Sequence, residues 1–345
     1  MIITKEKIDQ LQSWVEEANH IVITAHKSPD GDSVGSSLGL FHYLKKKSDK
    51  VFICHPDEAP DFLHWLPGYD HILNLDQHQK DVEENLSKAD LIFCLDYNSP
   101  GRIGKMEKIL TASDAKKILI DHHRDPDMEF CELMFSDITA CSTSQLICEI
   151  IDASGDDHLI DETLGTPLYA GIITDTGSFR FSSTLPKTHH IAANLMEHGV
   201  RHYKVHENIY DTNSLDKIRL SSYALLEKLE VLEQYETAFI SLSQEELKRF
   251  SAQKGDTEGL VNQVLAIEGV KMAVFMKEVE GIVKMSFRSK DNIPVNELAS
   301  NHFSGGGHLN ASGGKYVGGI DDAVKKFVTI LPTFVEEHKA QFNEV

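Results

Sequence analysis

The sequence predicts an α/β fold in which a mostly parallel-sheet domain is joined by a helical linker to a smaller α/β domain. Short apolar and β-branched runs alternate with helical patterns in the first half of the chain, which is typical of a parallel sheet covered by helices on both faces. The β pattern stops after about Thr188 and returns from Thr237. The length of 345 residues also suits about two domains better than one.

The first domain opens with a predicted helix, because apolar residues recur at helical spacing from Ile8 to Ala18. The β-branched run Ile21–Thr24 then predicts a buried strand. Small residues over Gly31–Ser37 predict a loop, and the apolar positions after it predict a crossover helix. The remaining predicted elements of this half are strands at 51–54, 91–95 and 118–120, a helix at 142–151 and a buried apolar segment at 168–173.

From His189 to about Leu232 the pattern predicts consecutive helices with polar interruptions. We therefore expect a first domain at residues 1–190, a helical linker at 191–233 and a second domain at 234–345. The predicted elements of the second domain are strands at 238–242, 271–276 and 281–287, helices at 260–267 and 295–302, a glycine-rich loop at 305–314 and a closing helix from Asp321.

Composition excludes several classes of protein. Hydrophobic residues make up 41% of the chain and charged residues 26%, which is ordinary for a folded globular protein. No apolar run approaches the ~18 residues of a membrane span, and acidic residues interrupt the N-terminal stretch where a signal peptide would be apolar. The five cysteines form no CxxC pair. We expect a cytoplasmic protein with reduced thiols and no membrane partner.

The net charge limits the partners. The formal charge is −20, from 54 acidic and 34 basic residues. Affinity for long DNA or RNA comes mainly from Lys and Arg side chains that neutralise phosphates, so this charge disfavours a nuclease that tracks long duplexes. Bound divalent cations would invert the local sign and allow an acidic protein to bind a small phosphate ester.

Side chains that can bind metal ions follow three of the predicted strands. In chain order they are His26, Asp30 and Asp32, then Asp96, then Asp121, His122 and His123, with Asp175 after the apolar segment 168–173. Because the carboxyl ends of parallel strands lie along one edge of a sheet, we expect these side chains on one rim. Taken alone, an aspartate in a Pro-Asp-Gly-Asp stretch is more often a turn residue. Their joint occurrence at three strand ends favours a metal site.

The ligand types indicate which ions would fit. Oxygen and imidazole ligands without thiolate suit Mn²⁺, Mg²⁺ or Fe²⁺ better than a structural zinc ion. Two ions about 4 Å apart need a bridging carboxylate and several acidic ligands, and this set is large enough to hold both. In an extended loop Asp30 and Asp32 would share one face, so both could reach the same cluster.

These residues fall in four motifs that resemble, in order, those of the DHH phosphoesterases: His26-Lys-Ser-Pro-Asp30-Gly-Asp32-Ser, Asp96, Asp121-His122-His123 and Thr174-Asp175-Thr176-Gly177. A later stretch resembles the signature of the DHHA1 domain: Gly305-Gly306-Gly307-His308-Leu-Asn310-Ala311-Ser312-Gly313. The resemblance spans nearly the whole chain. Within the family the chain looks closest to the bifunctional oligoribonuclease and phosphoadenosine phosphate (pAp) phosphatase proteins of the NrnA type.

The resemblance implies a role for each matching residue. One ion would be held by His26, Asp30 and Asp96, and the other by Asp32, Asp96, His122 and Asp175, so that Asp96 bridges the two. The two divalent cations would be Mn²⁺, with Mg²⁺ or Co²⁺ as alternatives. The predicted catalytic residues beside these ligands are Asp121, which would orient an imidazole, and His123, which would touch the scissile phosphate. The ions would activate a water molecule, so no protein nucleophile is expected.

The glycine stretch of the second domain is the predicted substrate grip. Consecutive glycines let backbone N–H groups approach an anion closely. Arg288, at the end of a predicted strand, would add a planar bidentate phosphate contact. Taken alone, the glycines are equally compatible with a flexible turn and Arg288 with a surface arginine. The full set of predicted substrate contacts is Arg288, Gly305, Gly306, Gly307, His308, Asn310 and, as a weaker candidate, Arg180.

The combined prediction is a phosphoesterase that hydrolyses short oligoribonucleotides to mononucleotides and removes the 3′-phosphate of pAp. Two alternatives stay open at this point: a phosphodiesterase specialised for the linear dinucleotide pApA, and a non-catalytic nucleotide-binding regulator. A regulator would be favoured by a replaced metal ligand, and no matched position is replaced. The sequence also leaves open the order of substrate preference, the polarity of cleavage and whether the chain forms a homodimer.

Overall fold

The structure, a computed structural model, describes residues 2–253 and 255–343. The chain divides into two compact units, Met1–Thr212 and Asn213–Val345, each with its own sheet and hydrophobic core. The helices predicted at 191–233 are shared between the units. In this segment α7 and α8 belong to the first unit and α9 to the second.

The first unit contains six parallel strands in the order β3-β2-β1-β4-β5-β6. The strand order reverses between β1 and β4, and such a switch point is where ligands bind in open parallel sheets. The strands are β1 (Ile21–Ala25), β2 (Val51–His55), β3 (Ile72–Asn74), β4 (Leu91–Leu95), β5 (Lys116–Asp121) and β6 (Leu133–Ser136).

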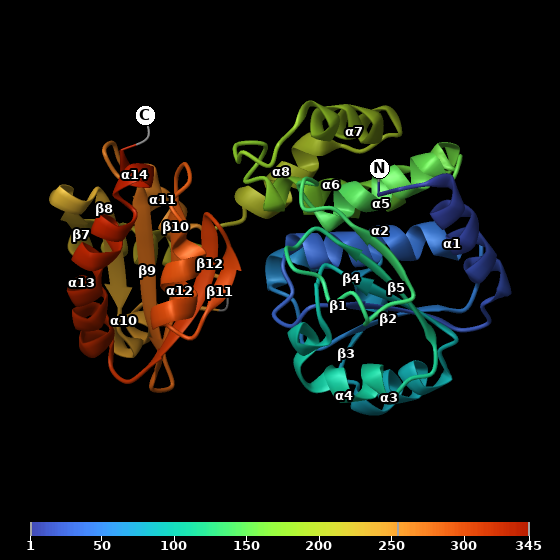
Figure 1. Cartoon of the computed structure of the whole chain (residues 1–345), viewed down its shortest axis with the longest axis horizontal. Coiled ribbons are helices and arrows are strands. Elements are labelled where there is room, and N and C mark those ends of the chain that lie inside the picture. The colour runs from blue at the N-terminus through green and yellow to red at the C-terminus, as the bar shows by residue number, and fades with distance from the viewer. Residues whose placement is uncertain (1, 254, 344–345) are drawn as a thin grey trace. The chain divides into compact units, whose positions relative to one another are not determined.

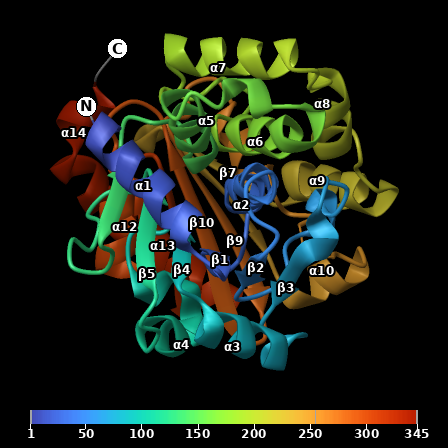
Figure 2. The same ribbon diagram turned by 90° about the vertical axis from the view of Figure 1, so that its right-hand side faces the viewer.

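Helices cover both faces of this sheet (Figure 1). The α3 and α4 helices lie on one face, and α1, α2, α5 and α6 lie on the other, with α7 and α8 outside α5 and α6 (Figure 2). Ile21 and Ile23 of β1 point into one core and Val22 into the other. The helices are α1 (Lys5–Glu17), α2 (Gly31–Lys45), α3 (Gln79–Lys88), α4 (Glu107–Thr111), α5 (Thr143–Ala153), α6 (Glu162–Asp175), α7 (Pro186–Glu197) and α8 (His202–Tyr210).

The prediction of a loop over Gly31–Ser37 is wrong, because α2 already begins at Gly31. Asp30 caps this helix: its side chain accepts hydrogen bonds from the backbone N–H groups of Asp32 and Ser33. The small residues serve a close helix contact instead of a loop. A Cβ at Gly35 would lie 2.4 Å from the Pro167 carbonyl oxygen of α6.

The apolar segment 168–173 lies within α6, which ends at Asp175. Its residues are buried on all sides. For so short a run, periodicity does not distinguish a buried helix from a buried strand. Asp175 therefore comes from a helix end, whereas His26, Asp96 and Asp121 come from strand ends.

The second unit has a mixed sheet in the order β11-β12-β10-β9-β8-β7, in which only β8 and β9 pair in parallel. One core packs the sheet against α12 and α13, and another packs it against α9 and α11. Its elements are α9 (Leu215–Glu227), β7 (Leu229–Leu232), β8 (Thr237–Leu242), α10 (Gln244–Arg249), α11 (Leu260–Leu265), β9 (Met272–Val279), β10 (Ile282–Ser289), α12 (Val295–His302), β11 (Gly306–His308), β12 (Ala311–Val317), α13 (Ile320–Glu337) and α14 (Lys339–Phe342).

The glycine-rich stretch, predicted as a loop, is largely the β11–β12 hairpin. Its glycines permit tight packing, since a Cβ at Gly305 would lie 2.0 Å from the Gly313 carbonyl oxygen. The α/β prediction for the two halves of the chain is confirmed. Among the described residues, no helix combines the length and the apolar character that a membrane crossing requires.

Candidate metal centre

The predicted metal ligands converge at the carboxyl edge of the first sheet. His26 follows β1, Asp96 follows β4, and His122 follows β5 directly. Asp30 and Asp32 come from the start of α2, whose N-terminus faces the same edge, and Asp175 is the last residue of α6. Six residues far apart in the sequence are thus brought together by the topology.

A first group consists of His26, Asp30 and Asp96, whose ligand atoms lie within 4.8 Å of one another. The His26 Nε2 atom lies 3.6 Å from Asp30 Oδ2 and 3.3 Å from Asp96 Oδ2. The other ring nitrogen, Nδ1, lies 2.9 Å from the Lys27 carbonyl oxygen. A proton on Nδ1 would donate to that carbonyl and leave Nε2 as the ligand atom.

A second group consists of Asp32, Asp96 and His122, again within 4.8 Å of one another. The His122 Nε2 atom lies 3.4 Å from Asp96 Oδ1, 3.4 Å from Asp175 Oδ2 and 4.0 Å from Asp32 Oδ2. Asp175 therefore joins this group through His122. The Asp32, Asp96 and His122 side chains are all buried.

Asp96 is common to both groups and divides its oxygens between them. Its Oδ2 atom faces His26 and its Oδ1 atom faces His122. The backbone of Asp96 has φ +62°, the left-handed region that residues other than glycine rarely adopt. Such a conformation persists where the surroundings hold it in place, and it is common at functional sites.

Neighbouring carboxylates raise the pKa values of the two histidines in this cluster. Burial alone lowers the pKa of His26, but Asp30 and Asp96 outweigh burial and hold that pKa well above its usual value. His122 behaves alike: burial lowers its pKa, and Asp175 and Asp96 raise it further than burial lowers it. Protons and cations would therefore compete for the same ring nitrogens of His26 and His122.

The pKa values of the carboxylates in this cluster are shifted in different directions. Burial, with the Asp96 charge, raises the pKa of Asp32 well above its usual value. Burial also raises the pKa of Asp175 to about 6, although 33% of that side chain is exposed. Burial would raise the pKa of Asp96 as well, but hydrogen bonds from His122 and His26 hold it well below its usual range. Crowded buried carboxylates are the environment that divalent cations stabilise, so the donor set fits such ions.

The two predicted catalytic residues contact each other. Asp121 Oδ1 lies 2.7 Å from His123 Nδ1, and the Asp121 side chain is fully buried. The imidazole that Asp121 contacts is therefore His123, not His26 or His122. His123 Nδ1 also lies 3.7 Å from Asp96 Oδ1, and ligand atoms of Asp96, Asp121 and His123 lie within 4.8 Å of one another. Asp121 Oδ2 is buried without a hydrogen-bond partner among the described residues.

The predicted helix at 142–151 corresponds to α5, but the sequence does not predict that the first residues of α5 contact two of the candidate metal ligands. The Thr143 and Ser144 backbone N–H groups donate to Asp32, at 2.6 and 2.9 Å. The Thr143 hydroxyl donates to Asp96 Oδ1 at 3.0 Å. Three consecutive hydroxyl residues at the start of a predicted helix, Ser142 to Ser144, were the available signal.

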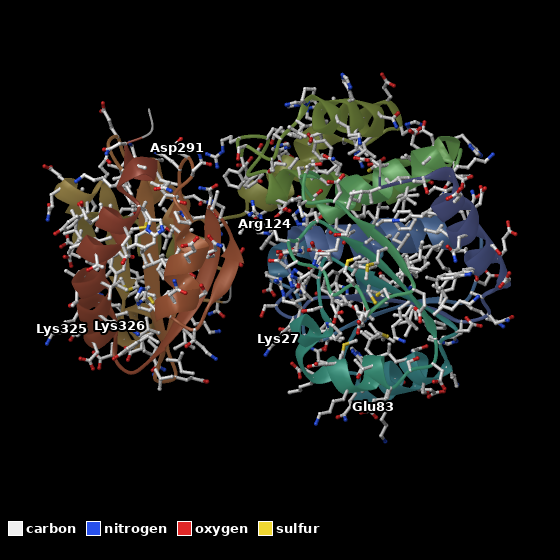
Figure 3. The ribbon with its side chains drawn as sticks, in the orientation of Figure 1. Lys27, Glu83, Arg124, Asp291, Lys325 and Lys326 are labelled. Atoms are coloured by element: carbon white, nitrogen blue, oxygen red, sulfur yellow. The ribbon has the colours of Figure 1, made fainter. Side chains whose placement is uncertain are left out.

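Two cationic side chains directly follow residues of this cluster. Lys27 follows His26 and Arg124 follows His123, and both are exposed on the first unit (Figure 3). Arg180, a predicted substrate contact, donates from its Nε atom to the Gly177 carbonyl oxygen at 2.8 Å. Its guanidinium therefore also stabilises the turn that follows α6.

The remaining predicted substrate contacts lie in the second unit. Arg288 lies near the end of β10, where it pairs with Ala273 on one side and Ala311 on the other. His308 ends β11. The Asn310 side-chain amide donates to Ser289 Oγ at 3.0 Å and to the Asp291 carbonyl oxygen at 2.8 Å, so it stabilises the hairpin.

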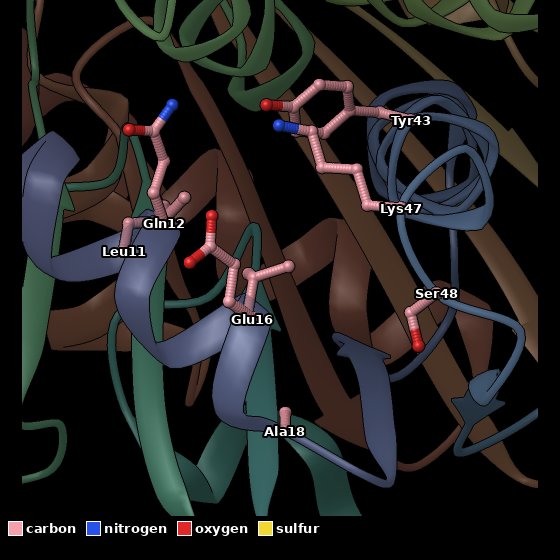
Figure 4. A pocket seen from close by; sticks show the side chains of 8 residues that line it. Leu11, Gln12, Glu16, Ala18, Tyr43, Lys47 and Ser48 are labelled. Carbon is pink, nitrogen blue, oxygen red and sulfur yellow. The ribbon is translucent and has the colours of Figure 1, made fainter.

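A cavity of about 100 Å³ lies elsewhere in the first unit, between α1 and the C-terminal end of α2 (Figure 4). Its polar lining includes Lys47 and Tyr43, both of which contact Asp156, at 2.5 and 2.6 Å. None of the predicted site residues lines it. The Lys47 and Tyr43 contacts tie the end of α2 to the turn that follows α5.

Comparisons with known proteins match both units. The model of the DHH family, N-terminal domain, matches residues 20–172, and that of the DHHA1 domain matches residues 237–337. The chain is 29% identical over 309 residues to the bifunctional oligoribonuclease and PAP phosphatase NrnA of Thermus thermophilus, covering 89% of this chain and 87% of the relative. A Streptococcus mutans protein named "Probable bifunctional oligoribonuclease and PAP phosphatase NrnA" is 30% identical over 294 residues, covering 85% and 88%.

A crystal structure is also similar over the whole chain. It is that of an exopolyphosphatase-related protein from Bacteroides fragilis, with 39% identity and a TM-score of 0.93, and the match covers 99% of this chain and 100% of that one. The motif residues, the fold and these similarities agree. The chain therefore belongs to the DHH phosphoesterase family, in the branch that carries a DHHA1 domain and includes the NrnA-type proteins.

Proposed function

We propose that this chain is a divalent-metal-dependent phosphoesterase that hydrolyses short oligoribonucleotides to mononucleotides and removes the 3′-phosphate of pAp. The observation that carries the proposal is the pair of ligand groups that share Asp96. Two adjacent groups with a common carboxylate are what a two-metal phosphoesterase requires. The substrate class is proposed from the names of the NrnA-type relatives.

In this proposal His26, Asp30 and Asp96 hold one cation, and Asp32, Asp96, His122 and Asp175 hold the other. Mn²⁺ is the proposed ion, because it accepts mixed oxygen and imidazole ligands. When bound, a pair of such ions lowers the pKa of a water molecule and offsets negative charge on the phosphate.

The chain's own groups supply orientation and charge. Asp121 fixes the orientation of the His123 ring through the 2.7 Å contact. The proposed role of His123 is to donate a hydrogen bond to the substrate phosphate. Lys27 and Arg124 add positive charge beside the acidic cluster. In the second unit, Arg288, His308, Asn310 and the glycines from Gly305 to Gly307 are the proposed contacts to the remote part of the nucleotide, and Arg180 is a further candidate.

The decisive assay uses the purified full chain with Mn²⁺ and a panel of 5′-labelled RNA from 2-mers to 24-mers, together with pAp, pApA and pyrophosphate. We expect hydrolysis of 2-mers and of pAp, with loss of both activities on treatment with a chelator. The labelled products report the polarity of cleavage. Dominant activity on pApA alone would favour the dinucleotide phosphodiesterase. Binding of pAp with no hydrolysis of any substrate would favour the non-catalytic regulator.

A further inference from the structure

The N-terminus of α5 contacts two carboxylates of the metal centre at once. The Thr143 N–H donates to Asp32 Oδ2 at 2.6 Å, and the Ser144 N–H donates to Asp32 Oδ1 at 2.9 Å. The Thr143 hydroxyl donates to Asp96 Oδ1 at 3.0 Å. Thr143 and Ser144 are fully buried, so water does not compete for these hydrogen bonds.

The position of this helix end is itself fixed. Ser142 caps α5, with its hydroxyl accepting a hydrogen bond from the Gln145 N–H at 3.0 Å. Leu146 and Ile147, one turn further on, are buried in the core between the sheet and α6. Thr143 therefore offers its hydroxyl and its N–H from a rigid support, which is what the orientation of a metal ligand needs.

The hydroxyl acts on the one side chain that both ligand groups share. Asp96 Oδ1 lies 3.4 Å from His122 Nε2, and Asp96 Oδ2 lies 3.3 Å from His26 Nε2. A carboxylate oxygen has two lone pairs. The Thr143 hydroxyl can therefore donate to Oδ1 while the same oxygen faces His122 Nε2 and, at 3.7 Å, His123 Nδ1. It thereby limits rotation of the carboxylate and keeps one oxygen facing each group.

We propose that Thr143 is a positioning residue for the metal pair. Its hydroxyl fixes the plane of the shared Asp96 carboxylate, and its N–H fixes the orientation of the Asp32 carboxylate. This inference rests on the proposed function, because it presumes that Asp96 bridges two cations. Groups that orient metal ligands typically change metal affinity or activity by about 10- to 100-fold when they are removed. Loss of the hydroxyl alone should therefore affect the metals without affecting the fold.

The test compares three variants of the full chain. Thr143→Val removes the hydroxyl but keeps the shape and the N–H, and Thr143→Ser keeps the hydroxyl. The matched control is Thr237→Val in the second unit, where a fully buried hydroxyl donates to the Tyr235 carbonyl oxygen at 2.7 Å. Each metal-free protein is titrated with Mn²⁺ by calorimetry, and electron paramagnetic resonance shows whether two Mn²⁺ ions are magnetically coupled.

The wild-type chain should bind two coupled ions, and so should Thr143→Ser and Thr237→Val. Thr143→Val should bind at least one ion about 10- to 100-fold more weakly and lose the coupled spectrum. Wild-type affinities and a coupled spectrum in Thr143→Val would overturn the positioning role and leave the proposed function intact. A wild-type chain that binds no coupled pair would overturn both. If Thr143→Val does not fold, Thr143→Ala removes the same hydroxyl and is judged by the same two measurements.

Discussion

Asp96 is the residue on which both proposed cation sites depend. Its two oxygens face different histidines, and its backbone is held in the left-handed region. Asn and Asp tolerate this backbone conformation better than other residues with a side chain. A change at this position can therefore separate the effect of the charge from the effect of the backbone.

We expect Asp96→Asn to keep the fold and to lose both tightly bound Mn²⁺ ions, because an amide is a weaker ligand and cannot bridge two cations as a carboxylate does. Elemental analysis after dialysis measures the ions per chain, and the exposed Asp114→Asn serves as the control. Two retained ions in Asp96→Asn would show that the ligand assignment is wrong.

The buried side chain of His55 should make the free energy of unfolding depend on pH, because its ring is neutral in the folded protein. The ring is fully buried on β2, with Nε2 3.0 Å from Ser37 Oγ, and burial lowers its pKa to about 3. Above the ordinary pKa of about 6.5 the ring is neutral in the folded and unfolded chains alike. As the pH falls from there toward 3, only the unfolded chain gains the proton, so the folded state loses stability.

The loss should amount to about 1.4 kcal/mol for each pH unit in that window. We therefore expect the free energy of unfolding of the wild type to fall by about 1.4 kcal/mol more than that of His55→Gln between pH 7.5 and 5.5. Urea unfolding at the two pH values measures it. Equal falls in both proteins would mean that the ring is protonated in the folded state.

At the scale of elements, continuous apolar runs in the sequence predicted most strands of the first sheet. The runs at 21–24, 91–95 and 118–120 correspond to β1, β4 and β5, because strands buried on both faces have continuous apolar sequences. The short β3 and β6 strands were not predicted, since three or four residues carry little periodicity. The start of α2 was missed because glycine indicates loops in general, while here it lets α2 approach α6 closely.

The candidate site also contains residues that the sequence predicts and one that it does not. Asp and His residues at strand ends could be predicted from local sequence, because the topology of a parallel sheet brings strand ends together. Their proposed roles as ligands stay predictions. Thr143 could not be found this way, since its contacts to Asp32 and Asp96 join residues 111 and 47 positions apart and depend on where α5 docks.

The α8 helix supports the turn that follows Asp175. Three consecutive residues of this turn, Gly177, Ser178 and Phe179, have φ values of +54°, +62° and +64°. Non-glycine residues in such conformations cost about 1–3 kcal/mol each and need support from their surroundings. Part of that support comes from α8, where Tyr210 donates to the Ile173 carbonyl oxygen at 3.0 Å and His206 Nε2 lies 3.1 Å from Ser178 Oγ.

We expect Tyr210→Phe to lower the free energy of unfolding by about 1 kcal/mol and to speed hydrogen exchange at the Ser178 amide, because the Ile173 carbonyl loses one of its two donors. The matched control is Tyr203→Phe on the same helix, whose side chain is 50% exposed. Mass spectrometry after exchange measures the effect. If exchange in the turn stays unchanged, α8 does not stabilise it.

At the scale of the whole molecule, the net charge and the proposed cation pair act in opposite directions. A formal charge of −20 repels every phosphate that is not held at a specific position. In the proposed function, binding energy therefore comes from the proposed cation pair of the first unit and from the proposed contacts of the second. In that proposal each further nucleotide adds repulsion but no further specific contact.

We therefore expect kcat/KM to be greatest for RNA of about two to five nucleotides and to fall steadily for longer strands. Salt should act in the unusual direction: raising KCl from about 50 to about 200 mM weakens most nucleic-acid binding, but here it should screen the repulsion and improve the relative rate on a 24-mer. Steady-state rates on 2-mers, 5-mers and 24-mers of one sequence, at both salt concentrations, measure the two effects. A 24-mer cleaved as efficiently as a 2-mer, and more weakly bound at high salt, would require a basic path for long RNA, which is hard to reconcile with this net charge.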